Sequence, residues 1–203
     1  AYLIPYFASS PNKSPSPTPT TTATSTPIVA LGIEDLFSVF SEVSIGVGAN
    51  IFEDLVLKIN KDALAGGEPG LYKIIDPQSS LRYSFSSFMS SALVTIPEEI
   101  IPFIDNDNFY VSLMQKTDSE YSRSFIIKLK NEVGISEALN RWESNAPTNL
   151  KTMFDLGIEQ AASLNFLDNT YQGVTIRYRN FPDTLKTIDY AVIAAVDDNK
   201  YLV

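Results

Sequence analysis

Residues 9–27 (SSPNKSPSPTPTTTATSTP) constrain the fold most, because they are all Ser, Thr or Pro except for Asn12, Lys13 and Ala23. Such a tract has too few apolar side chains to offset the entropy cost of ordering, and its prolines favour extended polyproline II. We therefore expect a disordered, semi-stiff spacer. It separates a short apolar stub, residues 1–8, from residues 28–203, which must contain any folded domain.

The stub begins with AYLIPYF, far short of the roughly 20 apolar residues that cross a bilayer. An apolar segment next to a Ser/Thr/Pro stalk favours the outer end of a membrane anchor over a disordered terminus or an expression remnant. The chain starts at Ala1 rather than Met and stops at Val203 within a predicted strand. We therefore expect it to be an excerpt of a longer polypeptide.

Residues 28–203 are predicted to form an α+β domain. Apolar residues recur at helical spacing in some segments and alternate in others. The predicted helices are 51–59, 85–92 and 135–142. The apolar stripe of the last helix continues at Leu150, Met153 and Phe154, after Pro147, which either begins a new helix or kinks the old one. The predicted strands are 42–47, 71–75, 109–114, 125–130, 174–179, 188–194 and 200–203. A capping box at Thr95–Glu98 predicts a further short helix ending near Asp105.

The order of these elements predicts the architecture. The strands 109–114 and 125–130 are predicted to form an antiparallel hairpin, and the last three strands a meander. Helices followed by adjacent strands favour a largely antiparallel sheet with helices packed on one face. Segments 42–130 and 134–203 have similar content, so two subdomains split near 131–134 are an alternative.

Composition excludes several chemistries within this chain. It has no Cys and no His, which excludes disulfides, thiolate sites, Ser-His-Asp and Cys-His catalysis, and HExxH zinc sites. Its formal charge is −9, with 15 basic residues scattered among 24 acidic ones. The nearest approach to a basic patch is Arg177 and Arg179 on one strand face, so nucleic acid is disfavoured as a partner. An acidic body would also be repelled by anionic lipids, which leaves the anchor as the membrane contact.

Several short segments resemble a known domain. They are Phe85–Pro97 (FSSFMSSALVTIP), Trp142-Glu143, Asn149-Leu150, Thr175–Pro182 (TIRYRNFP) and Ile188–Tyr190 (IDY). In that order they resemble an uncharacterised extracytoplasmic domain of membrane-anchored proteins from small-genome bacteria, which usually follows one transmembrane helix and a Pro/Ser/Thr-rich spacer. The resemblance covers most of residues 42–203. It implies a body outside the membrane and no known activity, hence no catalytic residues.

Four polar or glycine-rich motifs favour structural interpretations. Asp105–Asn108 supplies oxygen ligands but lacks the glycine and distal Glu of a calcium loop, so a solvated turn is favoured. Asp197–Asn199 is predicted to be a tight hairpin turn. Residues 10–13 match a Ser/Lys nucleophile spacing, but the spacer offers no helix to bring the two side chains together. Gly46–Gly48 is typical of a bend at a strand end rather than a phosphate-binding loop.

Carboxylates and aromatic residues give the remaining candidates. Glu98 with Glu99, or Glu143 with Asp155, are possible acid and base pairs for glycoside hydrolysis, but no pattern places either pair together. Trp142 lies on the apolar stripe of its helix, which favours a core position over ligand stacking. Tyr178 and Tyr190 are on neighbouring strands that would flank a groove or fill a sheet face.

These observations favour a non-enzymatic, membrane-tethered cell-surface module that binds a protein or envelope component. The alternatives are a periplasmic subunit of a pilus or secretion assembly, which would make an oligomeric contact through an edge strand, and an extracytoplasmic hydrolase that uses carboxylates alone. No catalytic residue, metal site or cofactor is predicted, and the oligomeric state stays open.

Overall fold

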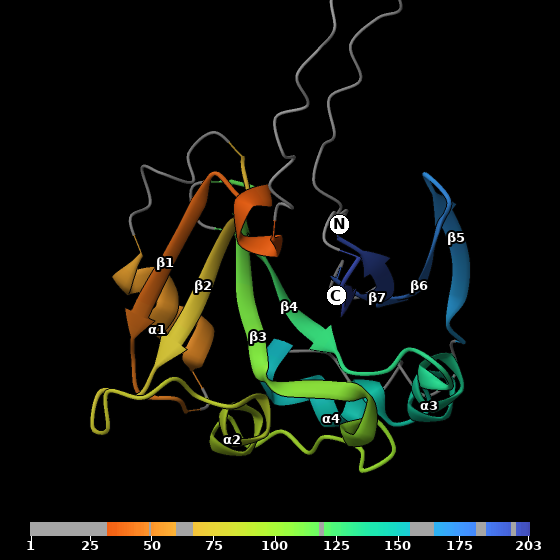
Figure 1. The fold of residues 1–203 in the computed structure, drawn as a ribbon, viewed down its shortest axis with the longest axis horizontal. Coiled ribbons are helices and arrows are strands. Elements are labelled where there is room, and N and C mark those ends of the chain that lie inside the picture. Colours follow the sequence, from red (N-terminus) through yellow and green to blue (C-terminus); the bar gives the residue numbers. More distant parts are fainter. Residues whose placement is uncertain are drawn as a thin grey trace, which may run out of the picture.

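The computed structural model describes residues 32–48, 50–59, 67–117, 120–154, 165–181, 186–195 and 198–203. The predicted stub and spacer lie outside these ranges. The described residues form one open eight-stranded sheet with the order β1-β2-β3-β4-β8-β7-β6-β5 (Figure 1). Of the pairings between these strands, only that of β1 with β2 is parallel. The predicted α+β class with a largely antiparallel sheet is confirmed.

The elements follow one another in an order close to the predicted one. They are η1 (Ile33–Leu36), β1 (Val39–Ser44), α1 (Ile51–Lys58), β2 (Gly70–Ile75), α2 (Phe85–Ser91), η3 (Ile101–Phe103), β3 (Ile104–Gln115), β4 (Tyr121–Leu129), α3 (Ile135–Trp142), α4 (Ala146–Phe154), β5 (Leu167–Tyr171), β6 (Val174–Phe181), β7 (Lys186–Ala194) and β8 (Lys200–Leu202). Strands from both halves of the chain belong to the same sheet, because β8 pairs with β4 on one side and β7 on the other.

The helices cover one face of the sheet, here called the inner face. The main core contains Phe52 of α1, Phe88 of α2 and Leu139 of α3, packed with inner-face residues such as Phe109 of β3. Phe88 and Phe109 lie with ring centroids 5.3 Å apart. The opposite, outer face has a smaller core to which η1 contributes Ile33. The helix periods seen in the sequence therefore bury apolar stripes against one side of the sheet.

Three sequence predictions differ from the structure. The helix expected after Thr95 is reduced to the short 3-10 helix η3, whose N-cap residue Ile100 has no side-chain cap. Asp105–Asn108 does not form a turn between elements but belongs to β3, where the pairing with β4 is irregular between Ile104 and Phe109. The strand expected at 42–47 is β1, three residues earlier.

Pro147 begins a new helix, α4, rather than kinking α3.

Strand β5 was not expected at all. It forms a hairpin with β6 through Gln172 and Gly173, which have φ of +50° and +81°. Positive φ at both central residues is the conformation of a type I′ turn, which matches the twist of a two-residue hairpin. β7 pairs with β6 up to Ala191 and with β8 from Val192 onward. The β5–β6 hairpin consequently forms the far edge of the sheet (Figure 1).

Candidate functional site

The candidate site lies where the end of α3 meets β5, β6 and β7. The stripe Ile135, Ala138 and Leu139 buries α3 against the inner face. This packing places Glu143, the residue directly after the helix, beside the sheet. Arg177 of β6 is paired in register with Tyr190 of β7 and with Asp168 of β5, so all three side chains are on the inner face.

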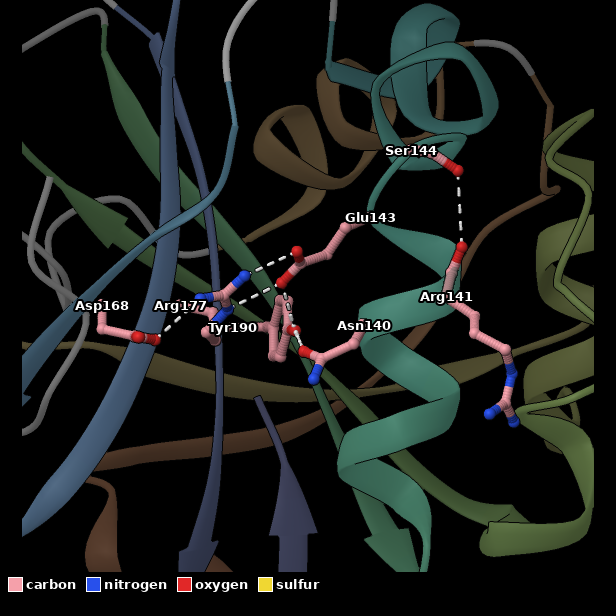
Figure 2. Close-up of polar contacts among 7 residues, drawn as sticks. All are labelled: Asn140, Arg141, Glu143, Ser144, Asp168, Arg177 and Tyr190. Atoms are coloured by element: carbon pink, nitrogen blue, oxygen red, sulfur yellow. Dashed lines mark hydrogen bonds and ion pairs between the residues drawn. The ribbon is translucent and has the colours of Figure 1, made fainter.

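Arg177 and Tyr190 together donate three hydrogen bonds to the Glu143 carboxylate (Figure 2). Arg177 Nε donates to Glu143 Oε1 at 2.7 Å, and Arg177 Nη2 donates to Oε2 at 2.6 Å. The Tyr190 hydroxyl donates to Oε1 at 2.7 Å. Arg177 Nη1 donates to Asp168 Oδ1 at 2.8 Å. We call these four residues, Glu143, Asp168, Arg177 and Tyr190, the α3 clamp.

The electrostatics of the α3 clamp favour binding α3 to the sheet over catalysis. Hydrogen bonds that Arg177 donates to Glu143 and Asp168 raise the pKa of Arg177, which stays protonated. Burial, reinforced by the bond to Glu143, raises the pKa of the Tyr190 hydroxyl well above its usual range. A general acid or base needs a pKa near the working pH and an atom free to meet a substrate. Arg177 and Tyr190 therefore stay protonated near neutral pH, and each Glu143 oxygen already accepts a hydrogen bond.

A small hollow lies on the other side of α3, beside Trp142. It has a volume of about 200 Å³ and is lined by Pro97, Glu99, Arg141, Trp142, Asn145 and Asn149. Pockets for drug-sized ligands measure roughly 300–1,000 Å³. Arg141 points away from the α3 clamp, toward this second side (Figure 2). Trp142 also packs against the main core, which confirms its predicted core role.

The predicted acid and base pairs are not assembled in the described residues. Glu98 and Glu99 are both exposed, and only Glu99 lines the hollow. Asp155, the expected partner of Glu143, lies outside the described residues. Glu143 instead binds Arg177 and Tyr190.

The groove between Tyr178 and Tyr190 is not formed. Tyr178 is paired with Asp189, one position away from the Arg177 and Tyr190 pair. Because side chains alternate along a strand, Tyr178 faces the outer side and Tyr190 the inner side. Arg177 and Arg179 share the inner face, but Arg177 is ion-paired and Arg179 is buried, so they form no basic surface patch.

The oxygen-rich segments serve structural roles. Asn106 Oδ1 accepts hydrogen bonds from the backbone and hydroxyl of Ser86, and Asn108 Nδ2 donates to Asp105 Oδ2 at 2.7 Å. Asp198, with φ of +61°, closes a turn in which its amide donates to the Ala195 carbonyl. Asp197 lies outside the described residues. Within the ranges that the structure describes, no three Asp or Glu side chains are grouped as metal ligands.

Sequence reasoning did not predict the α3 clamp. Each of Glu143, Arg177 and Tyr190 lies in one of the short segments that carry the family resemblance, but the resemblance assigns them no role. The available signal was Arg177 at an inward position of a strand that also points Phe181 inward. An arginine at a core-facing position is costly without a partner, which favours a carboxylate beside it.

A second cluster, also missed, joins η1 to the outer face of the sheet. Lys73 Nζ lies 2.6 Å from Glu34 Oε1, which also accepts from the Tyr110 hydroxyl at 2.8 Å. Burial raises the pKa of Glu34, but the bonds from Lys73 and Tyr110 outweigh it and leave the pKa below its usual value. Lys73 further lies 4.8 Å from the centre of the Phe40 ring. This cluster holds η1 on the sheet.

Among the described elements β5 is the most exposed, and it lies at one edge of the sheet, with β1 at the other. All five of its residues are exposed. Leu167 and Tyr171 are 54 % and 42 % exposed. Their partners in the hairpin, Tyr178 and Val174, share their face and are only half-buried. We call Leu167, Asn169, Tyr171, Val174, Ile176 and Tyr178 the hairpin outer face.

Comparison with known proteins gives no assignment: no family model, no curated protein and no solved structure matches this chain. None of the described helices is long and apolar enough to cross a membrane.

Proposed function

We propose that this chain is a non-enzymatic, membrane-tethered surface module that binds a protein partner by adding a strand to β5. The observation that carries the proposal is the exposure of every β5 residue at a sheet edge that pairs with no other strand among the described residues. Natural proteins usually protect such edges with charges, prolines or covering elements, because an open edge pairs with other chains. β5 has one charged residue, Asp168, and no proline.

The hairpin geometry identifies the main-chain groups that a partner would use. In a two-residue hairpin the residues that flank the turn, here Tyr171 and Val174, exchange both hydrogen bonds. Bonding then alternates along β5, so Asn169 and Leu167 also bond to β6. The N–H and C=O groups of Asp168 and Thr170 therefore point away from β6. These are the groups that strand addition requires.

The side chains of β5 define the partner. An added strand would place alternate residues beside Leu167 and Tyr171, which favours apolar side chains there, and the others beside Asp168. The chain carries a net charge of −9. Both features favour an extended, basic segment with apolar residues at alternate positions. The predicted stub and spacer would hold this edge away from the membrane.

The proposal is tested by photo-crosslinking on cells that make the full protein. A photoreactive side chain replaces Leu167, and a matched control replaces Val133, an exposed aliphatic residue in the loop before α3. We expect a discrete crosslinked product from position 167 and none from position 133. The substitution Thr170→Pro removes an outward N–H and is expected to abolish that product while leaving the β5–β6 ladder intact.

Two outcomes would refute strand addition at β5. One is the same crosslinked products from positions 167 and 133. The other is a product from position 167 that persists in Thr170→Pro. If Thr170→Pro fails to fold, the double substitution Leu167→Asp and Tyr171→Asp tests the same edge, because both side chains are exposed and support no core contact. A product consisting of two copies of this chain would favour the assembly-subunit alternative.

A further inference from the structure

Arg179 is a buried arginine on the inner face of β6. It lies two residues after Arg177, opposite Ile188 of β7, and its guanidinium carbon is 5.7 Å from the centre of the Phe181 ring. Only 5 % of its surface is exposed. Burial with no opposing acidic group lowers its pKa. An arginine nevertheless remains charged in proteins, so this position holds a buried positive charge.

Two nitrogens of Arg179 lack partners. Nε and Nη2 are both buried and donate a hydrogen bond to no residue in the described part of the chain. Glu143 and Asp168, two acids that lie on the inner side of this hairpin, are bound by Arg177. Breaking a buried ion pair by removing one partner is strongly unfavourable, and an arginine without any partner has the same cost.

The unpartnered nitrogens lie on the edge that binds oxyanions. The N–H groups of Nε and Nη2 lie in the guanidinium plane and point outward from the same edge. Such a pair can form two parallel hydrogen bonds to a carboxylate or phosphate. Arg177 shows this geometry in the same strand, since its Nε and Nη2 each donate to one oxygen of Glu143. Arg179 presents the same pair of donors with no acid of the described chain opposite them.

We propose that Arg179 is the receptor of one oxyanion, a carboxylate or phosphate group supplied by a molecule other than this chain. The ligand accepts two hydrogen bonds from Nε and Nη2, with the Phe181 ring beside the guanidinium. The site stands on Arg179 alone and does not depend on strand addition at β5. Asp155, Glu159 and Asp183, which are among the acidic residues outside the described ranges, are a rival source of a carboxylate within the chain.

The test is anion-dependent folding stability of the full chain, measured by urea unfolding with Trp142 fluorescence. Sodium phosphate and sodium acetate are titrated at constant ionic strength against sodium chloride. An anion present at ten times its Kd should raise the apparent folding constant about 11-fold. The phosphate and acetate arms show which oxyanion geometry is preferred. The Nε–Hε resonance of Arg179 in the unmodified chain should shift over the same concentration range.

Arg179→Met and Arg123→Met separate the site from general salt effects. Arg123 is also an inner-face arginine, but its Nη2 already bonds to Glu53 at 3.2 Å. Arg179→Met should lose the anion response, and in chloride its folding constant should equal or exceed that of the unmodified chain, because a buried unpaired charge is removed. Arg123→Met should keep the full anion response.

Two results would overturn the proposal. The first is an unmodified chain whose stability and Arg179 resonance respond no more to phosphate or acetate than to chloride. If a variant with Asp155→Asn, Glu159→Gln and Asp183→Asn then gains the response, the chain itself supplies the carboxylate. The second is an Arg179→Met variant that responds to the anion as strongly as the unmodified chain. If Arg179→Met does not fold, the resonance titration decides alone.

Discussion

Replacing Glu143 with Gln tests whether the α3 clamp holds α3 to the sheet. The glutamine keeps the shape of the side chain but loses the negative charge and one of the acceptor oxygens that receive Arg177. The Glu143 side chain is only 14 % exposed, so solvent replaces little of the lost interaction. Asp168, which bonds to the same arginine, is 64 % exposed and provides a matched control.

The structure sets the expected magnitude. A hydrogen bond to a charged group contributes about 1.5–3 kcal/mol, and breaking a buried pair costs about 3–5 kcal/mol. Arg177 is a quarter exposed and keeps its bond to Asp168, which reduces the loss. We expect Glu143→Gln to lower the free energy of unfolding by about 1.5 kcal/mol. Asp168→Asn should lower it by less than about 0.5 kcal/mol, as for exposed ion pairs.

Trp142 provides the assay. It is the only tryptophan, directly precedes Glu143 and packs against the main core, so its fluorescence reports the docking of α3. Urea unfolding of the two variants should show different midpoints with an unchanged denaturant slope. A Tyr190→Phe variant combined with Glu143→Gln should lose less than the sum of the two single changes, because Tyr190→Phe removes a hydrogen bond that Glu143→Gln already weakens.

The reasoning is refuted if Glu143→Gln and Asp168→Asn have the same free energy of unfolding, or if that of Asp168→Asn is the lower. Either result would mean that the burial of Glu143 does not determine its contribution. An additive double variant would equally contradict the assignment of the Tyr190 bond to Glu143.

Three further predictions concern the strands. Burial raises the pKa of Tyr72 to about 12; the unfolded chain then releases this proton first, near pH 10, so Tyr72 should contribute a fall in stability of about 1.4 kcal/mol per pH unit between pH 10 and 12, in addition to the falls from Tyr110 and Tyr190, whose pKa values are also raised. Tyr72→Phe should remove that one-proton contribution in urea unfolding, without loss at pH 7, because the described part of the chain offers the buried hydroxyl no hydrogen-bond partner. Gly70→Ala should destabilise the protein by about 1–3 kcal/mol in the same assay, since the new methyl carbon would lie 2.8 Å from Tyr72 Cζ; an unchanged midpoint would mean that the ring moves freely. Gln172→Asn should raise the melting temperature, because Asn-Gly is the preferred type I′ turn, and a lower melting temperature would contradict the turn assignment.

The helices and most strands were predictable because each buries one face, and the apolar residues of that face recur at regular spacing in the sequence. The α3 stripe Ile135, Ala138 and Leu139 is an example. β5 escaped prediction because LDNTY is exposed on both sides and alternates in neither polarity nor size. Its position is set by pairing with β6 and by the Gln172-Gly173 turn. The helix expected after Thr95 failed because Pro97 and Pro102 remove backbone donors that a helix interior needs.

The α3 clamp could not be predicted because it depends on register. Arg177 lies opposite Tyr190 only through the β6–β7 pairing, and Glu143 reaches both from a helix more than thirty residues earlier along the chain. Sequence spacing carries no information on such a contact. The open edge of β5 is hidden for the same reason, since which strand lies at the edge follows from the whole sheet order.

The most direct test of strand addition is amide hydrogen exchange of β5, measured by mass spectrometry on the full protein alone and on intact cells that make it. The account predicts slower exchange on cells for the segment 167–171, confined to that strand and absent in Thr170→Pro. Exchange of β5 that is equally fast in both settings, or protection spread evenly over the described strands, would contradict it.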